Sequence, residues 1–209
     1  VGGVPANATA VTLNVTVTGT TAASFLTIWP KGDTQPTASN LNWSAGQTIP
    51  NAVVAKVGTG GQIDVFNNAG TADVILDVAG YFAKGTGAQF HPLTPTRTLD
   101  SRPASKVGPY DTPWGPQTAR SLAVAGGATV PASAVAVQHN MTVTDTSAAS
   151  YLTVFPGDQP QPLVSSLNWS TGRTVANQVI TPIGGTGVIW IANRAGTADV
   201  IADVNGWFG

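Results

Sequence analysis

One stretch of the chain occurs twice, as Ala69-Gly-Thr-Ala-Asp-Val-Ile-Leu-Asp-Val-Ala-Gly-Tyr-Phe82 and as Ala195-Gly-Thr-Ala-Asp-Val-Ile-Ala-Asp-Val-Asn-Gly-Trp-Phe208. The repetition extends outward from it. Residues 4–82 align with residues 130–208 without a gap, at a constant spacing of 126 positions (130 − 4). A period of this length is that of a whole domain and not of a solenoid layer. The sequence therefore predicts two homologous domains.

Within each block the apolar residues recur with period two. In residues 11–18, Val or Leu alternates with Thr or Asn, the pattern of a strand with one buried face. Similar short stretches are separated by turn signals such as Gly58-Thr-Gly-Gly61, and no window of helical length has a 3.6-residue period. The prediction is an all-β protein with two antiparallel β-sandwich domains in tandem, jelly-roll or Ig-like.

The expected division has three parts. Residues 1–83 form the first sandwich, residues 84–89 a linker, and residues 90–209 the second sandwich. The second sandwich begins with an opening segment, residues 90–102, that has no counterpart ahead of the first block. Its prolines favour an extended strand at a sheet edge. An unfilled edge recruits strands from other chains, so the uneven design predicts one domain with an open edge.

Composition limits the partners. Apolar residues make up 42% and charged residues 9%, with a net charge of −1. The scattered cations argue against nucleic acid, which needs a basic surface. No apolar run reaches the ~18 residues of a membrane span, and no signal peptide is visible. Since the chain starts at Val1 and not at Met, we expect a processed form or a piece of a longer protein.

The repeated motifs resemble a known repeat family. Val-Pro-Ala-x-Ala-x-Ala-Val, Asn-x-Thr-Val-Thr, Ser-x-Leu-Asn and Asp-Val-x-Gly-Tyr/Trp-Phe are similar to a repeat domain of secreted and surface proteins of high-GC Gram-positive bacteria. In that family Phe-x-Pro-Leu-x-Pro-x-Arg-x-x-Asp-x-Arg opens each unit, and residues 90–102 match it. The resemblance covers nearly the whole chain. It implies an extracellular or cell-surface accessory module without known catalytic residues.

Each copy of the repeated stretch carries two aspartates on one strand face. Paired carboxylates serve acid–base chemistry or bind Ca²⁺ in other proteins, but here an isoleucine stands between them and no calcium-loop pattern accompanies them. We interpret Asp77 and Asp203 as structural pairing residues, because a buried carboxylate needs a partner. Arg97 or Arg102 is expected to neutralise Asp203.

The six tryptophans suggest a binding alternative. Trp43 and Trp169 are common to both copies, and they and Trp114 are the candidates for stacking on sugar rings. Core packing accounts for the same residues and is favoured.

Catalytic chemistry has little support in the sequence. The chain has no cysteine and no Gly-x-Ser-x-Gly elbow, and His139 replaces Leu13 on an apolar strand face. We therefore expect no enzyme, no cofactor and no metal. The predicted function is an extracellular structural or adhesive module, a cell-surface or filament-forming repeat that associates with itself, or with neighbouring domains of a longer chain, through strand edges. The alternative is a carbohydrate-binding module with polysaccharide as its partner, and a hydrolase is a distant third.

Overall fold

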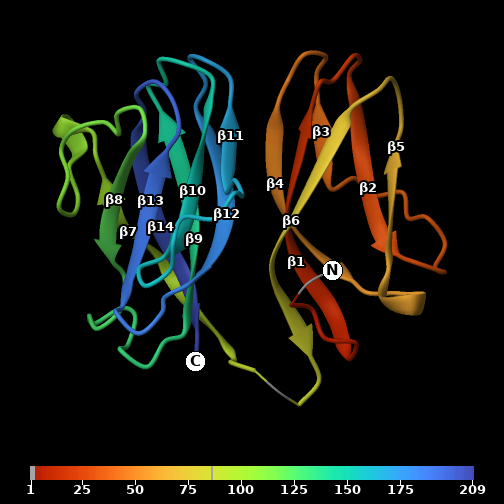
Figure 1. Ribbon diagram of the computed structural model, residues 1–209, viewed down its shortest axis with the longest axis horizontal. Coiled ribbons are helices and arrows are strands. Elements are labelled where there is room, and N and C mark those ends of the chain that lie inside the picture. The colour runs from red at the N-terminus through yellow and green to blue at the C-terminus, as the bar shows by residue number, and fades with distance from the viewer. Residues whose placement is uncertain (1–2, 86) are drawn as a thin grey trace. The chain divides into compact units, whose positions relative to one another are not determined.

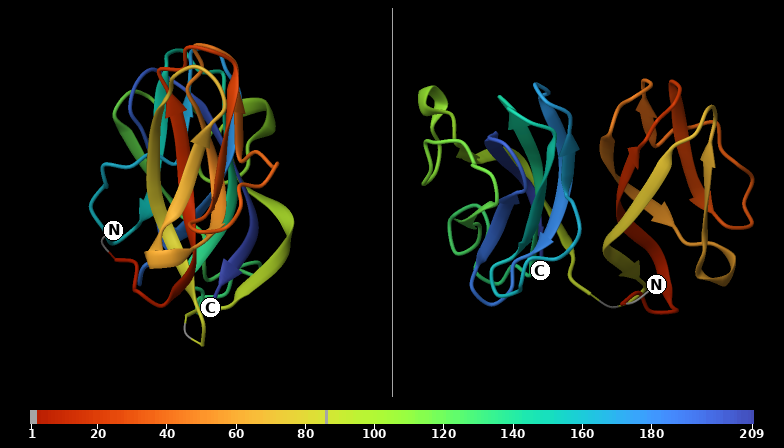
Figure 2. Two further views of the ribbon diagram at one scale, coloured as in Figure 1. Left: turned by 90° about the vertical axis from the view of Figure 1, so that its right-hand side faces the viewer. Right: turned by 45° about the horizontal axis from the view of Figure 1, so that its top comes forward.

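A computed structural model describes residues 3–85 and 87–209. The chain divides into two compact units, unit 1 (Val1–Gly87) and unit 2 (Ala88–Gly209). The boundary lies within the expected linker 84–89, of which residue 86 is outside the described residues. Each unit consists of two antiparallel sheets packed face to face (Figure 1; Figure 2).

Unit 2 has eight strands in two four-stranded sheets, with the orders β12-β9-β14-β7 and β11-β10-β13-β8. Successive strands alternate between the two sheets, except that β10 and β11 pair within one sheet, and this order is that of a jelly roll and not of the Ig-like alternative. The strands are β7 (Phe90–Asp100), β8 (Thr118–Ala123), β9 (Ala136–Thr144), β10 (Ser150–Pro156), β11 (Leu167–Trp169), β12 (Val175–Pro182), β13 (Val188–Asn193) and β14 (Asp199–Phe208).

In the described part of unit 1, six strands form two three-stranded sheets, with the orders β4-β1-β6 and β3-β2-β5. These orders match those of unit 2 after its first two strands, β7 and β8, are removed. The strands are β1 (Ala8–Thr18), β2 (Ser24–Pro30), β3 (Leu41–Trp43), β4 (Ile49–Lys56), β5 (Ile63–Asn67) and β6 (Asp73–Ala83). Within the described residues, unit 1 therefore has the jelly-roll order without counterparts of β7 and β8.

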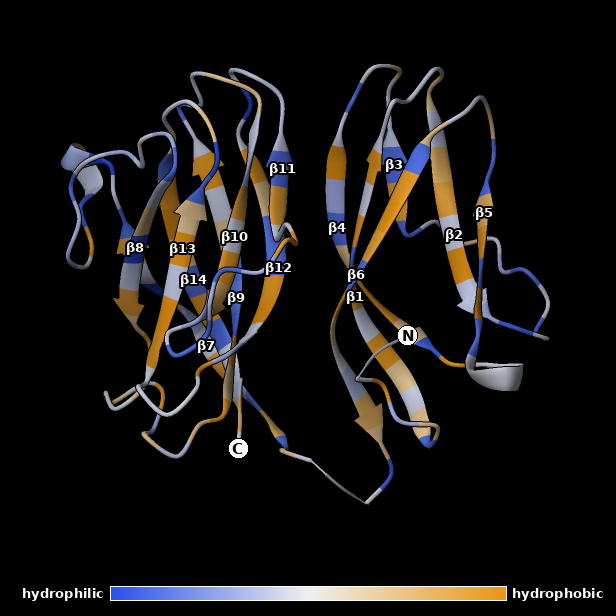
Figure 3. Ribbon diagram, viewed as in Figure 1, coloured by the Kyte–Doolittle hydropathy of each residue, from blue (hydrophilic) through white to orange (hydrophobic). Residues whose placement is uncertain are grey.

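The period-two pattern produces the core of each unit. Along β9 every second residue is buried, and Val137, Met141 and Val143 join the apolar cluster between the sheets. Val15 and Val17 on β1 do the same in unit 1. Figure 3 shows the resulting apolar bands along the strands. Among the described residues, no helix is long and apolar enough to cross a membrane.

Two local details follow from edge positions. Pro50 does not break β4, which runs unbroken through it opposite Thr16. The strand is the edge of its sheet, where a missing N–H is tolerated. The prolines of β7 are accommodated in the same way, since β7 is the edge strand next to β14. The opening segment thus belongs to unit 2.

Candidate functional site: the outer edges of β5 and β6

In unit 2, one continuous segment covers one edge of both sheets. β7 runs antiparallel to β14, from Phe90 opposite Phe208 to Asp100 opposite Ile201 (Figure 1). β8 runs antiparallel to β13 along residues 188–193. The loop between β7 and β8 crosses from one sheet to the other. Residues 90–123, which we call the β7–β8 segment, therefore cover the same edge of both sheets.

Charged side chains fasten β7 to β14. Arg97 Nε lies 2.8 Å from Asp203 Oδ1, and Arg97 Nη1 lies 3.1 Å from Asp100 Oδ2. Arg102 Nη2 donates to Asp100 Oδ2 at 2.7 Å. Of the two arginines expected to pair with Asp203, Arg97 does so and Arg102 binds the buried Asp100 instead. Hydrogen bonding from Arg102 holds the pKa of Asp100 below its usual value.

A serine fixes the end of the same strand pair. Ser101 Oγ donates to Asp199 Oδ1 at 2.6 Å and accepts from the Val200 N–H at 2.9 Å. The Ser101 N–H donates to the Val200 carbonyl at 3.1 Å. Ser101 is fully buried, so these bonds satisfy polar groups that have no access to water. No motif or spacing in the sequence points to Ser101 as a contact residue.

Trp114 anchors the loop between β7 and β8. Its indole is fully buried, and Nε1 donates to the Ile191 carbonyl of β13 at 2.8 Å. Its backbone exchanges hydrogen bonds with Ala198, and its carbonyl accepts from Asn193 Nδ2 at 3.3 Å. The Arg120 guanidinium lies 4.6 Å from the indole ring centroid. The loop is therefore held by an aromatic anchor with satisfied polar groups.

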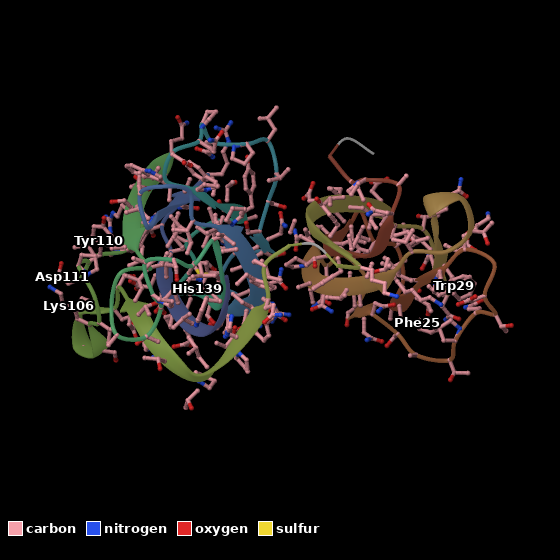
Figure 4. The ribbon with its side chains drawn as sticks, turned by 90° about the horizontal axis from the view of Figure 1, so that it is seen from below. Phe25, Trp29, Lys106, Tyr110, Asp111 and His139 are labelled. Carbon is pink, nitrogen blue, oxygen red and sulfur yellow. The ribbon has the colours of Figure 1, made fainter. Side chains whose placement is uncertain are left out.

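Around this anchor, Tyr110 makes an edge-on ring contact with Trp114 and donates its hydroxyl to the Ser121 carbonyl of β8. Lys106 pairs with Asp111 at 3.3 Å on the outer side of the same loop, near Tyr110 (Figure 4).

The sugar-stacking interpretation of the tryptophans is wrong for the three residues named. Trp43, Trp169 and Trp114 are all buried, with at most 6% of their surface exposed. Trp43 and Trp169 pack in the apolar clusters of their units, so none of the three presents a ring face to a ligand. Both copies keep a tryptophan at this position because both cores need it. Sequence alone did not separate that reason from a shared binding site.

In unit 1 the corresponding strands end their sheets. Among the described residues, no strand pairs with the outer edge of β6 or β5. Core-facing residues of these strands are exposed, whereas their unit 2 counterparts are not. The pairs are Val74 (39%) and Val200 (0%), Leu76 (39%) and Ala202 (0%), Val78 (40%) and Val204 (1%), and Val65 (39%) and Ile191 (0%).

The orientation of these side chains follows from their neighbours. Val74 lies opposite Val17, Leu76 opposite Val15 and Val78 opposite Leu13, three residues of the unit 1 core. Residues directly opposite in a sheet project from the same face. The exposed row on β6 is therefore an uncovered part of the core.

A glycine marks the same place. At Gly206, a Cβ atom would run into the ring of Phe90 on β7. At the equivalent Gly80 of unit 1, a Cβ atom would meet nothing within 4 Å. Gly80 does not have a positive φ either. Within unit 1, neither close packing nor the backbone conformation requires a glycine at position 80.

The polar groups that hold the β7–β8 segment also recur in unit 1. Asp77 takes the position of Asp203, Asp73 that of Asp199, and Asn67 that of Asn193. Asn67 Nδ2 donates to the Gly70 carbonyl, as Asn193 donates to Gly196. The two further acceptors of Asn193 belong to residues 114 and 115. Asn67 thus makes the hydrogen bond of Asn193 that stays within the repeated stretch, and not the two that reach the β7–β8 segment.

Other sites offer less chemistry. His139 is buried in unit 2 (Figure 4), and neither ring nitrogen has a hydrogen-bond partner among the described residues. Burial lowers its pKa to about 4, so it is a neutral core residue at pH 7. Among the described residues, no group of three or more His, Asp or Glu could hold a metal ion.

A comparison with protein-family models found no match to the chain, and a search of curated proteins found none either.

Proposed function

We propose that the chain is a non-enzymatic structural or adhesive module that works outside the cell and assembles through its β-strand edges. The observation that carries the proposal is the row Val74, Leu76 and Val78, core-facing yet about two-fifths exposed. An exposed apolar edge strand is a template for another strand. Most natural proteins protect such edges, so an edge left open favours assembly by strand addition.

The surface composition supports the same function. Only 9% of residues are charged and the net charge is −1, so copies repel one another weakly. The repeat design and the resemblance to bacterial surface repeats favour an extracellular or cell-surface location. No observation favours the carbohydrate-binding alternative, because its tryptophans are buried.

Sedimentation velocity at rising protein concentration tests the proposal. We expect the full chain to self-associate, and Ile75→Lys to weaken the association by about tenfold, since a charge on an edge strand opposes strand addition. Ile75 lies on β6 and is 45% exposed, so the substitution should leave the fold intact.

Val54→Lys is the matched control. It places the same charge on β4, at the other edge of the same sheet. A chain that remains monomeric at every concentration would contradict self-assembly, and equal effects of the two lysines would show that the β6 edge is not the contact.

A further inference from the structure

We propose that the open edges of β5 and β6 are the receptor for a single donated segment with the chemistry of residues 90–123, and that unit 1 is completed by it. This inference rests on the proposed function in that both use the β6 edge, but it names the partner. The donor is an extended peptide with an aromatic ring, an arginine, an Asp-Ser pair and a tryptophan at the spacings of Phe90, Arg97, Asp100-Ser101 and Trp114.

Unit 2 supplies the template for each contact. The arginine meets Asp77 as Arg97 meets Asp203, at the place where the two strands lie opposite each other. The serine meets Asp73 and the backbone of Val74, as Ser101 meets Asp199 and Val200. These groups stand on β6 in the order and spacing that they have on β14.

The tryptophan extends the contact to the second sheet. In unit 2 the Trp114 indole donates to the carbonyl of Ile191, and its own carbonyl accepts from Asn193. The equivalent groups are the carbonyl of Val65 and the amide of Asn67 on β5. Val65 is 39% exposed, whereas its counterpart Ile191 is fully buried. The position on β5 that corresponds to the Trp114 site of unit 2, which we call the tryptophan slot, is therefore open.

Gly80 carries the inference independently of the apolar surface. The glycine at 206 is needed because the Phe90 ring lies against it, and the space at Gly80 is empty. A glycine at this place has a packing reason only when an aromatic ring from a β7-like strand covers it. Unit 1 thus has a glycine at the position where a β7-like strand would place its aromatic ring.

Two other occupants fit less well. The β7–β8 segment of a second copy already covers β14 and β13 of its own unit 2. Moving it to unit 1 of another copy would expose those two strands. The β6 strand of a second copy would cover one sheet edge and leave β5 and its tryptophan slot open. A segment not yet folded into a unit covers both edges at once.

The test uses the full 209-residue chain and a fluorescein-labelled synthetic peptide of residues 88–123. Fluorescence anisotropy should show saturable binding of one peptide per chain. Hydrogen–deuterium exchange should show new protection on β5 and β6 and none on β13 and β14. A peptide with Trp114→Ala should bind about a hundredfold more weakly, since it loses a large buried aromatic group.

A size-matched pair of variants identifies the site. Gly80→Val fills space that is empty in the chain alone, so it should leave the fold unchanged and abolish peptide binding. A Phe90→Ala peptide should bind Gly80→Val about as well as it binds the unsubstituted chain. A merely structural role of Gly80 would not produce this rescue.

A fusion guards against a peptide that is poorly soluble. Residues 88–129 placed directly ahead of Val4 reproduce the unit 2 arrangement, and they should raise the unfolding temperature of unit 1 and protect β6 amides. Absence of peptide binding together with an unchanged β6 in the fusion would overturn the inference. If both tests fail while the chain self-associates, the inference is overturned and the proposed function stands, whereas peptide binding by a monomeric chain would do the reverse.

Discussion

At the scale of single residues, His139 makes unit 2 sensitive to acid. It replaces Leu13 of unit 1, and burial lowers its pKa from 6.5 to about 4 although the carboxylate of Asp203 opposes the shift. Above pH 6.5 the histidine is neutral in the folded and unfolded states. As the pH falls below 6.5, the unfolded state takes up a proton that the folded state does not, so stability declines down to about pH 4.

The expected loss is up to about 3 kcal/mol of unfolding free energy across that interval. Urea unfolding of unit 2 at several values between pH 7 and pH 4 measures it. His139→Leu, which copies unit 1, should remove most of the slope. Parallel pH profiles for the two proteins would show that His139 is not the acid-sensitive group.

Trp114 is the residue on which the loop between β7 and β8 depends. It is fully buried and donates one hydrogen bond to β13. Trp114→Ala should destabilise unit 2 by about 3–5 kcal/mol, because it leaves a large cavity and an unpaired carbonyl. Trp114→Phe keeps most of the volume and serves as the control in denaturant unfolding. A loss below 1 kcal/mol for the alanine variant would contradict the role of anchor.

At the scale of elements, the Asp100 cluster determines how firmly β7 holds. Asp100 is fully buried and receives hydrogen bonds from Arg97 and Arg102. Removing one donor by Arg102→Ala should destabilise unit 2 by about 1–3 kcal/mol, because a buried carboxylate loses its main partner. Lys106→Ala, which removes an exposed ion pair in the same segment, should cost less than about 1 kcal/mol. Equal losses in chemical denaturation would contradict this ranking.

The strands themselves were largely predictable. Period-two alternation located β1 because one of its faces meets the core of unit 1, and the prolines of residues 90–102 correctly indicated an edge strand. Sheet membership was not predictable, since alternation indicates which side of a strand is buried and not which strand lies beside it.

The site was predictable only in part. Pairing of Asp203 with an arginine followed from the cost of a buried charge, and the uneven number of opening segments indicated an open edge. The roles of Ser101 and Asn193 depend on partners 98 and 79 positions away in the chain, and the role of Gly80 depends on a contact that unit 1 lacks. Comparing each residue with its partner 126 positions away, once the contacts of one copy are known, is the signal that reveals them.

At the scale of the whole molecule, the two units should unfold separately. They are distinct compact units, and unit 1 leaves core-facing side chains exposed that unit 2 buries. Since buried apolar area is the main source of stability, unit 1 should melt first. Differential scanning calorimetry should show two transitions, with Trp114→Ala lowering only the upper one. A single transition, or an effect of this substitution on the lower one, would contradict the assignment.

In unit 1, β6 ends its sheet, whereas in unit 2 β14 has β7 beside it. Native-state hydrogen–deuterium exchange on the dilute full chain tests this difference by comparing the two strands at equivalent positions. We predict that alternate amides of β6, those pointing away from β1, exchange far faster than their partners on β14, whose hydrogen bonds to β7 protect them. Equal protection of β6 and β14 in the dilute chain would contradict an open edge in unit 1.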